Sequence, residues 1–176
     1  MDSQNSVIQK KVCLLGEFAI GKTSLVRRFV YNIFDERYLT TIGVSICRKE
    51  IATFDSTLLN LVIWDLASSD KYEDLRSHYL HGTAGALLVC DLTRPETIEA
   101  IRTTYVEQLL KNSPDSSIVL VGNKKDLINP ASDAINQLEK LALELDTPFQ
   151  TTSAKTGENV EAAFTLLANL LHKTDG

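Results

Sequence analysis

The chain has few cysteines and no long hydrophobic run. Its three cysteines among 176 residues are odd in number, widely spaced and set in apolar stretches: Cys13, Cys47 and Cys90. This usage predicts buried, reduced thiols of an intracellular protein, and it excludes a disulfide framework or a zinc site. No stretch approaches the roughly 18 consecutive apolar residues that a membrane-spanning helix needs. A transmembrane protein is therefore excluded.

Basic residues are also in deficit. Eighteen Lys and Arg stand against 23 Asp and Glu, which leaves a net charge of −5. A general nucleic-acid binder usually carries the opposite balance, so no nucleic-acid partner is expected.

Targeting signals are lacking at both ends of the sequence. Residue 2 is Asp2 where myristoylation needs glycine, the first residues show no signal-peptide pattern, and the last residues offer no cysteine for a prenyl anchor. We expect a cytoplasmic monomer without membrane association, or else a truncated form of a longer chain.

No internal repeat, low-complexity tract or linker rich in proline and glycine interrupts the sequence. This uniformity predicts one domain over residues 10–172, with an N-terminal extension over 1–9 and a short tail over 173–176. Hydrophobic residues make up 44% of the chain, enough to fill a globular core.

Short apolar runs alternate with stretches of helical periodicity. The expected strands are 11–15, 44–54, 57–64, 85–90, 117–121 and 148–151. The expected helices are 21–31 and 72–80, and three segments with apolar stripes: Ile98, Ile101, Tyr105, Leu109; Ile135, Leu138, Leu141, Leu145; Val160, Phe164, Leu167, Leu171. This order predicts an α/β fold: a six-stranded, mostly parallel sheet with five helices on its two faces. Ligands of such sheets bind at the carboxyl ends of the strands.

A phosphate-binding motif follows the first expected strand. The segment fits the pattern G-x-x-x-x-G-K-[ST] and reads Gly16-Glu17-Phe18-Ala19-Ile20-Gly21-Lys22-Thr23, with Ser24 next. The glycines let the backbone curl so that its N–H groups face phosphate oxygens. Lys22 supplies a charge between the β- and γ-phosphates, Thr23 offers a hydroxyl to Mg²⁺, and the following helix aims its positive end at the phosphates. The alternative, an ordinary glycine-rich turn, does not explain Lys-Thr. The motif predicts a P-loop NTPase.

A base-reading motif follows the strand over 117–121. The segment Asn123-Lys124-Lys125-Asp126 fits N-K-x-D, although a polar turn would look the same. The carboxylate of Asp126 can accept two hydrogen bonds from guanine, and adenine offers no such donor pair, so Asp126 is expected to select guanine. Asn123 and Lys124 would brace the loop and flank the base. After the last strand, Ser153-Ala154-Lys155 is expected to complete the base pocket.

Residues 10–172 resemble the small GTPases of the Ras superfamily. The resemblance rests on the phosphate-binding motif, the base-reading motif and Ser153-Ala154-Lys155, together with Thr41-Ile42-Gly43 and Trp64-Asp65. The Rab-like branch is the most similar, and a non-prenylated relative such as the Ras-like GTPases of bacteria is an alternative. The resemblance implies a sheet of six strands with five helices, GTP or GDP bound with Mg²⁺, and two loops that respond to the γ-phosphate. It implies that Thr23, Thr41 and, through water, Asp65 hold the metal.

The resemblance places the first switch at residues 34–43. It implies that Phe34 packs on the guanine, that Tyr38 covers the phosphates, and that Thr41 gives its hydroxyl to Mg²⁺ and its N–H to the γ-phosphate. The alternatives are a core aromatic for Phe34, an exposed tyrosine for Tyr38 and an ordinary strand-entry residue for Thr41.

The second switch departs from the family pattern W-D-x-A-G-Q-E. Ser68 stands where relatives have the glycine whose N–H contacts the γ-phosphate, and Ser69 stands where they have the glutamine that orients the attacking water. Phe18 and Ala19 stand where many relatives have small residues, and the ring of Phe18 either crowds the γ-phosphate or faces solvent.

These changes touch hydrolysis more than binding. We expect a molecular switch whose intrinsic GTP hydrolysis runs at or below roughly 10⁻⁴ per second, with Lys22, Thr41 and Ser69 as its catalytic residues. Asp70, Tyr72 and His78 are substitute candidates for positioning the water. The alternative is a pseudo-GTPase that keeps nucleotide as a stabilising structural ligand, or has lost the cycle altogether, and acts as a constitutive interaction module. A P-loop kinase is disfavoured by the base-reading motif.

A partner protein is expected on the switch loops and the strand pair between them. We call this region the switch surface: Ile42, Val44, Trp64, Tyr72 and Leu75. An effector, an exchange factor or a GTPase-activating protein would bind there, although Trp64 alone also fits core packing. The scattered cations Arg27, Arg28, Arg48, Lys49 and Arg76 are expected to lie on a solvated face.

Overall fold

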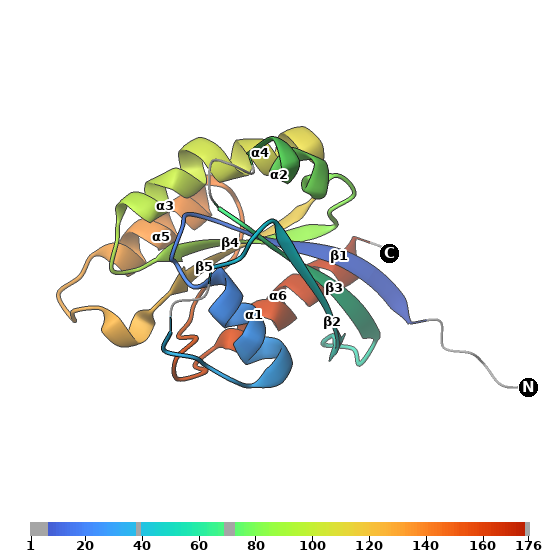
Figure 1. Ribbon diagram of the computed structural model, residues 1–176, viewed down its shortest axis with the longest axis horizontal. Helices are drawn as coiled ribbons and strands as arrows, with labels where there is room; N and C mark the ends of the chain where they lie inside the picture. Colours follow the sequence, from blue (N-terminus) through green and yellow to red (C-terminus); the bar gives the residue numbers. More distant parts are fainter. Residues whose placement is uncertain (1–6, 38–39, 69–72, 175–176) are drawn as a thin grey trace, which may run out of the picture.

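The computed structural model describes residues 7–37, 40–68 and 73–174. One six-stranded sheet, in the order β2-β3-β1-β4-β5-β6, forms the middle layer (Figure 1). The strands are β1 (Ile8–Leu15), β2 (Val44–Ala52), β3 (Leu58–Leu66), β4 (Gly85–Asp91), β5 (Ser117–Asn123) and β6 (Phe149–Thr151). Only β2 and β3 pair antiparallel among the described strands. The predicted α/β class and mostly parallel sheet are confirmed.

Helices cover both faces of the sheet. The bounds are α1 (Lys22–Tyr31), α2 (Glu73–Leu80), α3 (Glu96–Ala100), α4 (Val106–Asn112), α5 (Ala134–Glu144) and α6 (Val160–Lys173). A π-helical turn, η2 (Ile101–Tyr105), joins α3 to α4, so these three form one continuous helix. The described residues thus contain five long helices and one short 3-10 helix, η3 (Lys125–Leu127). Helices α1 and α6 lie on one face, and the others lie on the opposite face (Figure 1).

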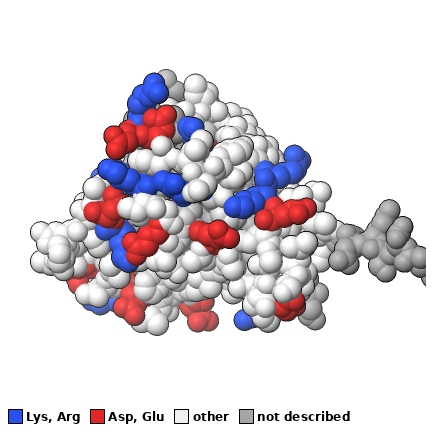
Figure 2. All heavy atoms as spheres, turned by 90° about the horizontal axis from the view of Figure 1, so that it is seen from below, with Lys and Arg blue, Asp and Glu red and all other residues white. Residues whose placement is uncertain are grey.

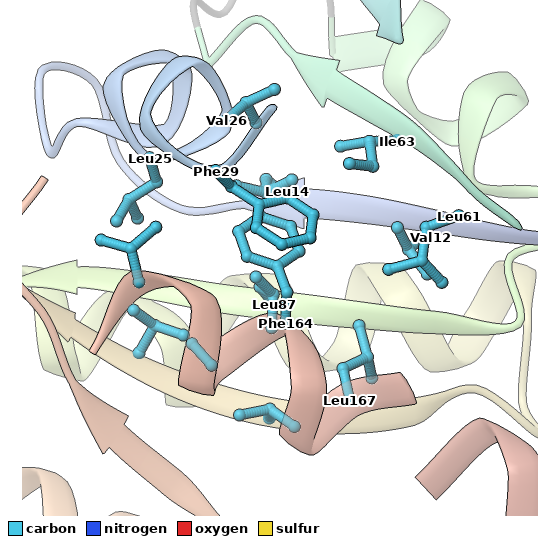
Figure 3. Packing of buried hydrophobic residues seen from close by; sticks show 14 of the residues in the cluster. Val12, Leu14, Leu25, Val26, Phe29, Leu61, Ile63, Leu87, Phe164 and Leu167 are labelled. Carbon is cyan, nitrogen blue, oxygen red and sulfur yellow. The ribbon is translucent and has the colours of Figure 1, made fainter. Parts of the chain in front are cut away.

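Each face of the sheet has its own core. Between α1, α6 and the sheet, the rings of Phe29 and Phe164 stack with their centroids 3.9 Å apart (Figure 3). On the other face, Leu80, Ile101 and Leu138 bury against β1, β4 and β5. Strand β4 is buried along its whole length, as expected for a central strand covered on both faces.

At the level of the fold, two sequence expectations need correction and one feature was not expected. Strand β1 begins at Ile8, because residues Ile8–Lys10 pair with β3 although their side chains are polar or exposed. Cys47 is half-buried, whereas Cys13 and Cys90 are buried, because Cys47 lies on the edge strand β2. The π-helical turn was not predicted.

The carboxyl ends of the parallel strands all lie at one edge of the sheet. The loops that follow β1, β3, β4, β5 and β6 therefore meet there, although they lie far apart in sequence. No helix in the described ranges is long and apolar enough to cross a membrane. On the face shown in Figure 2, Lys and Arg side chains alternate with Asp and Glu.

Candidate functional site

The loops at this edge surround a cavity of about 510 Å³. Most of the residues singled out from the sequence line it: Phe18, Ala19, Gly21, Lys22, Thr23, Ser24, Phe34, Thr41, Asp65, Ser68, Asn123, Lys124, Asp126, Ala154 and Lys155. Gly16, Ile20 and Ser153 are buried behind this lining. Tyr38, Ser69, Asp70 and Tyr72 lie outside the described residues. The structure thus brings segments from the whole chain around one space.

Steric contacts require glycine at both ends of the loop between β1 and α1. Gly16 has a φ of 147°, and a Cβ there would lie 2.2 Å from the carbonyl oxygen of Val89 on β4. Gly21 has a φ of 97°, and a Cβ there would lie 2.4 Å from the side-chain amide nitrogen of Asn123, Nδ2. The loop therefore sits tightly between two strand ends, and side chains are excluded at these two positions.

Lys22 begins α1 and turns back over this loop. Its side chain is 7% exposed, and its ammonium donates hydrogen bonds to the carbonyl oxygens of Gly16 at 3.0 Å and Glu17 at 2.9 Å, and to the hydroxyl of Ser68. Burial lowers the pKa of Lys22 to about 8, and the charge of Asp65 opposes this effect. The lysine charge is thus held at the floor of the cavity.

Three oxygen-bearing side chains meet beside Lys22. Thr23 Oγ1 donates to Asp65 Oδ2 at 2.5 Å and lies 2.6 Å from Thr41 Oγ1, which also donates to Asp65 Oδ2 at 3.2 Å. Burial raises the pKa of Asp65, against the hydrogen bond from Thr23 and the charge of Lys22. The second oxygen, Oδ1, is buried and has no hydrogen-bond partner among the described residues. A hard cation such as Mg²⁺ takes oxygen ligands of this kind, so the residues present fit that ion.

The loop after β5 is tied to the phosphate-motif loop. Asn123 donates from its side-chain amide to the carbonyl oxygen of Ile20 at 2.9 Å, and Lys124 donates to that of Ala19 at 2.8 Å. Asn123 also accepts, through Oδ1, the backbone N–H of Ala154 at 3.2 Å. Side chains of this loop therefore hold two neighbouring loops at once.

The segment after β6 supports the carboxylate of Asp126. Ser153 Oγ donates to Asp126 Oδ1 at 2.6 Å, while Asp126 itself is exposed at the cavity wall. Ser153 thus anchors one carboxylate oxygen of an aspartate that lines the cavity.

Sequence reasoning missed Asp91, at the end of β4. Its side chain is 1% exposed, and its Oδ2 accepts hydrogen bonds from Lys124 at 2.7 Å and from Arg94 Nε at 3.3 Å. Burial alone would raise the pKa of Asp91, but the hydrogen bonds from Lys124 and Thr93 outweigh it and hold the pKa below its ordinary value. Arg94 also donates to the carbonyl oxygen of Phe18 at 2.7 Å. An acid directly after a fully apolar strand was the signal that could have revealed this residue.

Arg28 is not the solvated surface cation that the sequence suggested. From α1 it donates through Nε to the carbonyl oxygen of Ala154 at 2.9 Å, and through a terminal nitrogen to that of Lys155 at 2.6 Å. The residues it holds lie more than 120 positions away, so only the folded chain brings them together.

Arg76 was also expected at the surface, and that expectation is wrong. It is 6% exposed because α2 packs against α4, and its guanidinium lies 5.9 Å from the ring centre of Tyr105. The hydroxyl of Tyr105 donates to Glu17 at 3.2 Å, so the Glu17 side chain points to η2 and away from the cavity. Lys49 likewise contacts Phe29, donating to its carbonyl oxygen and lying 4.2 Å from its ring centre.

The two phenylalanines at the cavity differ in exposure. Phe18 is 51% exposed at its mouth, whereas Phe34 is half-buried and packs against the core beneath α1. On the switch surface, Ile42 and Leu75 are exposed, and Trp64 lies with its ring centre 5.9 Å from that of Tyr79. His78 is exposed.

Comparison with known families gives a match that spans most of the chain. Residues 11–173 match the family described as the Ras family. The matched region includes every loop that lines the cavity.

Proposed function

The chain belongs to the Ras family, and from this premise we propose that it is a guanine-nucleotide-binding switch with slow GTP hydrolysis. The domain that does this would span residues 10–172 of a cytoplasmic, Rab-like protein. The observation that carries the proposal is the meeting of Lys22, the oxygen cluster around Asp65 and the carboxylate of Asp126 at one cavity.

Each part of the cavity suits one part of the nucleotide. The loop over residues 16–23 and Lys22 would bind the phosphates through backbone N–H groups and one cation. Asp126 would accept the N1–H and the exocyclic amine of guanine, which adenine cannot offer. Phe34, half-buried at the cavity, would pack against the base.

The residues around Asp65 would hold Mg²⁺. The hydroxyls of Thr23 and Thr41 would be its ligands, and Asp65 would act through water, its Oδ1 having no other partner within the described residues. Bound there, the ion would neutralise phosphate charge.

We expect slow hydrolysis because the second switch has Ser69 in place of the glutamine of relatives. Hydrolysis needs a positioned water and stabilised charge. Ser69 is two carbons shorter than the glutamine of relatives and would not reach that water in the same way. Partner proteins would bind the switch surface, where Ile42 and Leu75 expose apolar area.

The first test is to identify the nucleotide that the freshly purified protein releases on denaturation, using ion-pair chromatography. GDP or GTP at about one per chain supports the proposal. A single-turnover assay with GTP and Mg²⁺ then measures the rate, and a value clearly above roughly 10⁻⁴ per second would contradict slow hydrolysis.

Absence of nucleotide after purification calls for direct titration with GTP and Mg²⁺. Failure to bind in that titration would exclude the switch and leave the pseudo-GTPase. The matched control in both assays is Lys22→Ala, which removes the phosphate-binding cation and should lose the nucleotide.

A further inference from the structure

The phosphate-motif loop, residues 16–23, carries one acidic side chain, that of Glu17. The carbonyl oxygens of residues 16–20 accept hydrogen bonds from the side chains of Lys22, Arg94, Lys124 and Asn123. This orientation leaves the backbone N–H groups of the loop to face an anion. Donors that suit a phosphate also suit a carboxylate, so Glu17 is an anion tethered to the very loop that an anionic ligand would use.

The carboxylate of Glu17 is held outside the cavity by Tyr105. The Tyr105 hydroxyl donates a hydrogen bond to Glu17 Oε1 at 3.2 Å, and Glu17 does not line the cavity. Tyr105 is the last residue of η2 and is 3% exposed. Burial raises the pKa of Tyr105 to about 12, so the hydroxyl keeps its proton at neutral pH and remains a donor.

A buried cation lies on the same side as Tyr105. Arg76 is 6% exposed, and its guanidinium lies 5.9 Å from the centre of the tyrosine ring. After burial, the charges of Glu17 and Arg76 have the largest effects on the pKa of Tyr105, in opposite directions, so both groups act on its hydroxyl. Arg76 therefore adds an attraction that draws the Glu17 carboxylate toward η2.

The hydrophobic core requires the ring of Tyr105 but not its hydroxyl. The ring belongs to the core on the α2 face of the sheet, together with Ile101 and Leu109, and a phenylalanine would fill the same space. A buried tyrosine hydroxyl usually has a hydrogen-bond partner, and here the partner is Glu17. Tyr105 also ends a π-helical turn, a feature that is frequent at functional sites. The hydroxyl thus acts on the loop rather than on the core.

Lys22 is the cation that a released Glu17 carboxylate would meet. The ammonium of Lys22 already contacts the carbonyl oxygen of Glu17 at 2.9 Å. Burial lowers the pKa of Lys22, and the charges of Asp65 and Glu17 oppose this effect, so the Glu17 charge already acts on the ammonium. Without the hydrogen bond from Tyr105, the carboxylate would compete with a phosphate for Lys22 and for the N–H groups of the loop.

We propose that Tyr105 is a positioning residue that holds the Glu17 carboxylate away from the phosphate-motif loop and so keeps the loop available to the phosphates of a nucleotide. The inference rests on the proposed function, because it requires the loop and Lys22 to bind phosphates. It adds a residue of η2, far from the loop in sequence, to the groups that determine nucleotide affinity.

The test measures the affinity of the full chain for a fluorescent GDP with Mg²⁺. Tyr105→Phe removes the hydroxyl and keeps the ring. It should weaken GDP binding roughly tenfold, the scale of one hydrogen bond to a charged group. The same change made in Glu17→Gln, which has no charge to release, should leave the affinity equal to that of Glu17→Gln alone. A purely structural role of Tyr105 would not give this dependence on Glu17.

Tyr79→Phe is the matched control, because Tyr79 is a half-buried tyrosine of α2 that packs against Trp64, and it should bind GDP like the unmodified chain. Unchanged GDP affinity in Tyr105→Phe overturns the inference while the proposed function stands. A loss of equal size in the Glu17→Gln background also overturns it, because Tyr105 would then act through packing alone. If the unmodified chain does not bind GDP, the proposed function itself fails. Circular dichroism confirms that each variant is folded.

Discussion

The carboxylate of Asp91 accepts a hydrogen bond from the ammonium of Lys124 at 2.7 Å, at the carboxyl end of β4. Lys124 in turn donates to the carbonyl oxygen of Ala19, and Arg94, the second cation on Asp91, donates to that of Phe18. One buried acid thus orients two cations that hold consecutive residues of the phosphate-motif loop. The end of β4 binds no ligand in the proposed function, yet it sets the position of the loop that does.

Asp91→Asn should therefore weaken both the fold and the site. The amide keeps the size of the side chain but removes the negative charge, which leaves Lys124 and Arg94 without their anion. Because Lys124 and Arg94 are each about one-third exposed, the loss should cost about 1–3 kcal/mol of unfolding free energy, and nucleotide release should become faster. Urea denaturation and the dissociation rate of a fluorescent GDP measure the two effects. Asp115→Asn changes an exposed carboxylate and serves as the control; equal losses in both variants would contradict a role for Asp91.

Arg28→Ala should loosen the base-binding side of the cavity. The change removes the two hydrogen bonds that hold the carbonyl oxygens of Ala154 and Lys155. We expect the dissociation constant for GDP to rise roughly tenfold, since charged hydrogen bonds contribute about 1.5–3 kcal/mol each and these are partly exposed. Isothermal titration measures this, with Arg48→Ala, an exposed cation on β2, as control. An equal loss for a ligand made only of phosphates would point to general misfolding instead.

Asp126→Asn should change which base the protein prefers. Guanine offers two N–H donors to a carboxylate, whereas xanthine carries a carbonyl oxygen in place of the exocyclic amine. An asparagine amide donates to that oxygen and no longer satisfies both guanine donors. We expect GDP to bind more than 100-fold more weakly, on the order of the loss when a buried polar pair is broken, and xanthosine diphosphate to bind better than GDP. Competition between the two nucleotides measures this change in base preference. A retained preference for GDP would mean that Asp126 does not read the base.

The parts of the site that lie within one short segment were the parts that the sequence revealed. Residues 16–23 and 123–126 follow strands whose apolar runs are visible, and the parallel order then places them at one edge. Arg28, Arg76 and Asp91 were misjudged or missed because their partners lie in other segments. Whether an arginine is exposed or holds a carbonyl oxygen 126 positions away depends on helix packing that no local pattern encodes.

The limits of strands were less predictable than their existence. Residues Ile8–Lys10 have no alternation of buried and exposed side chains, and they extend β1 because β3 offers them hydrogen bonds. The stripe from Ile98 to Leu109 was recognised as helical, and all four of its apolar residues are buried. The π-helical turn within this segment could not be predicted, because the turn leaves the four apolar residues on the same face of the helix.

Removal of Mg²⁺ should speed the release of the nucleotide, because the oxygen cluster around Asp65 would lose its cation. Without the cation, the carboxylate of Asp65, which already lies against two hydroxyls, would face phosphate charge directly. Adding EDTA to the protein loaded with fluorescent GDP should raise the dissociation rate at least tenfold, and excess Mg²⁺ should restore it. Thr23→Ala, which removes one oxygen of the cluster, should make release fast already in Mg²⁺ and reduce the effect of EDTA. If EDTA accelerates release equally in Thr23→Ala and in the unmodified chain, the metal is held elsewhere and the assignment of this cluster is wrong.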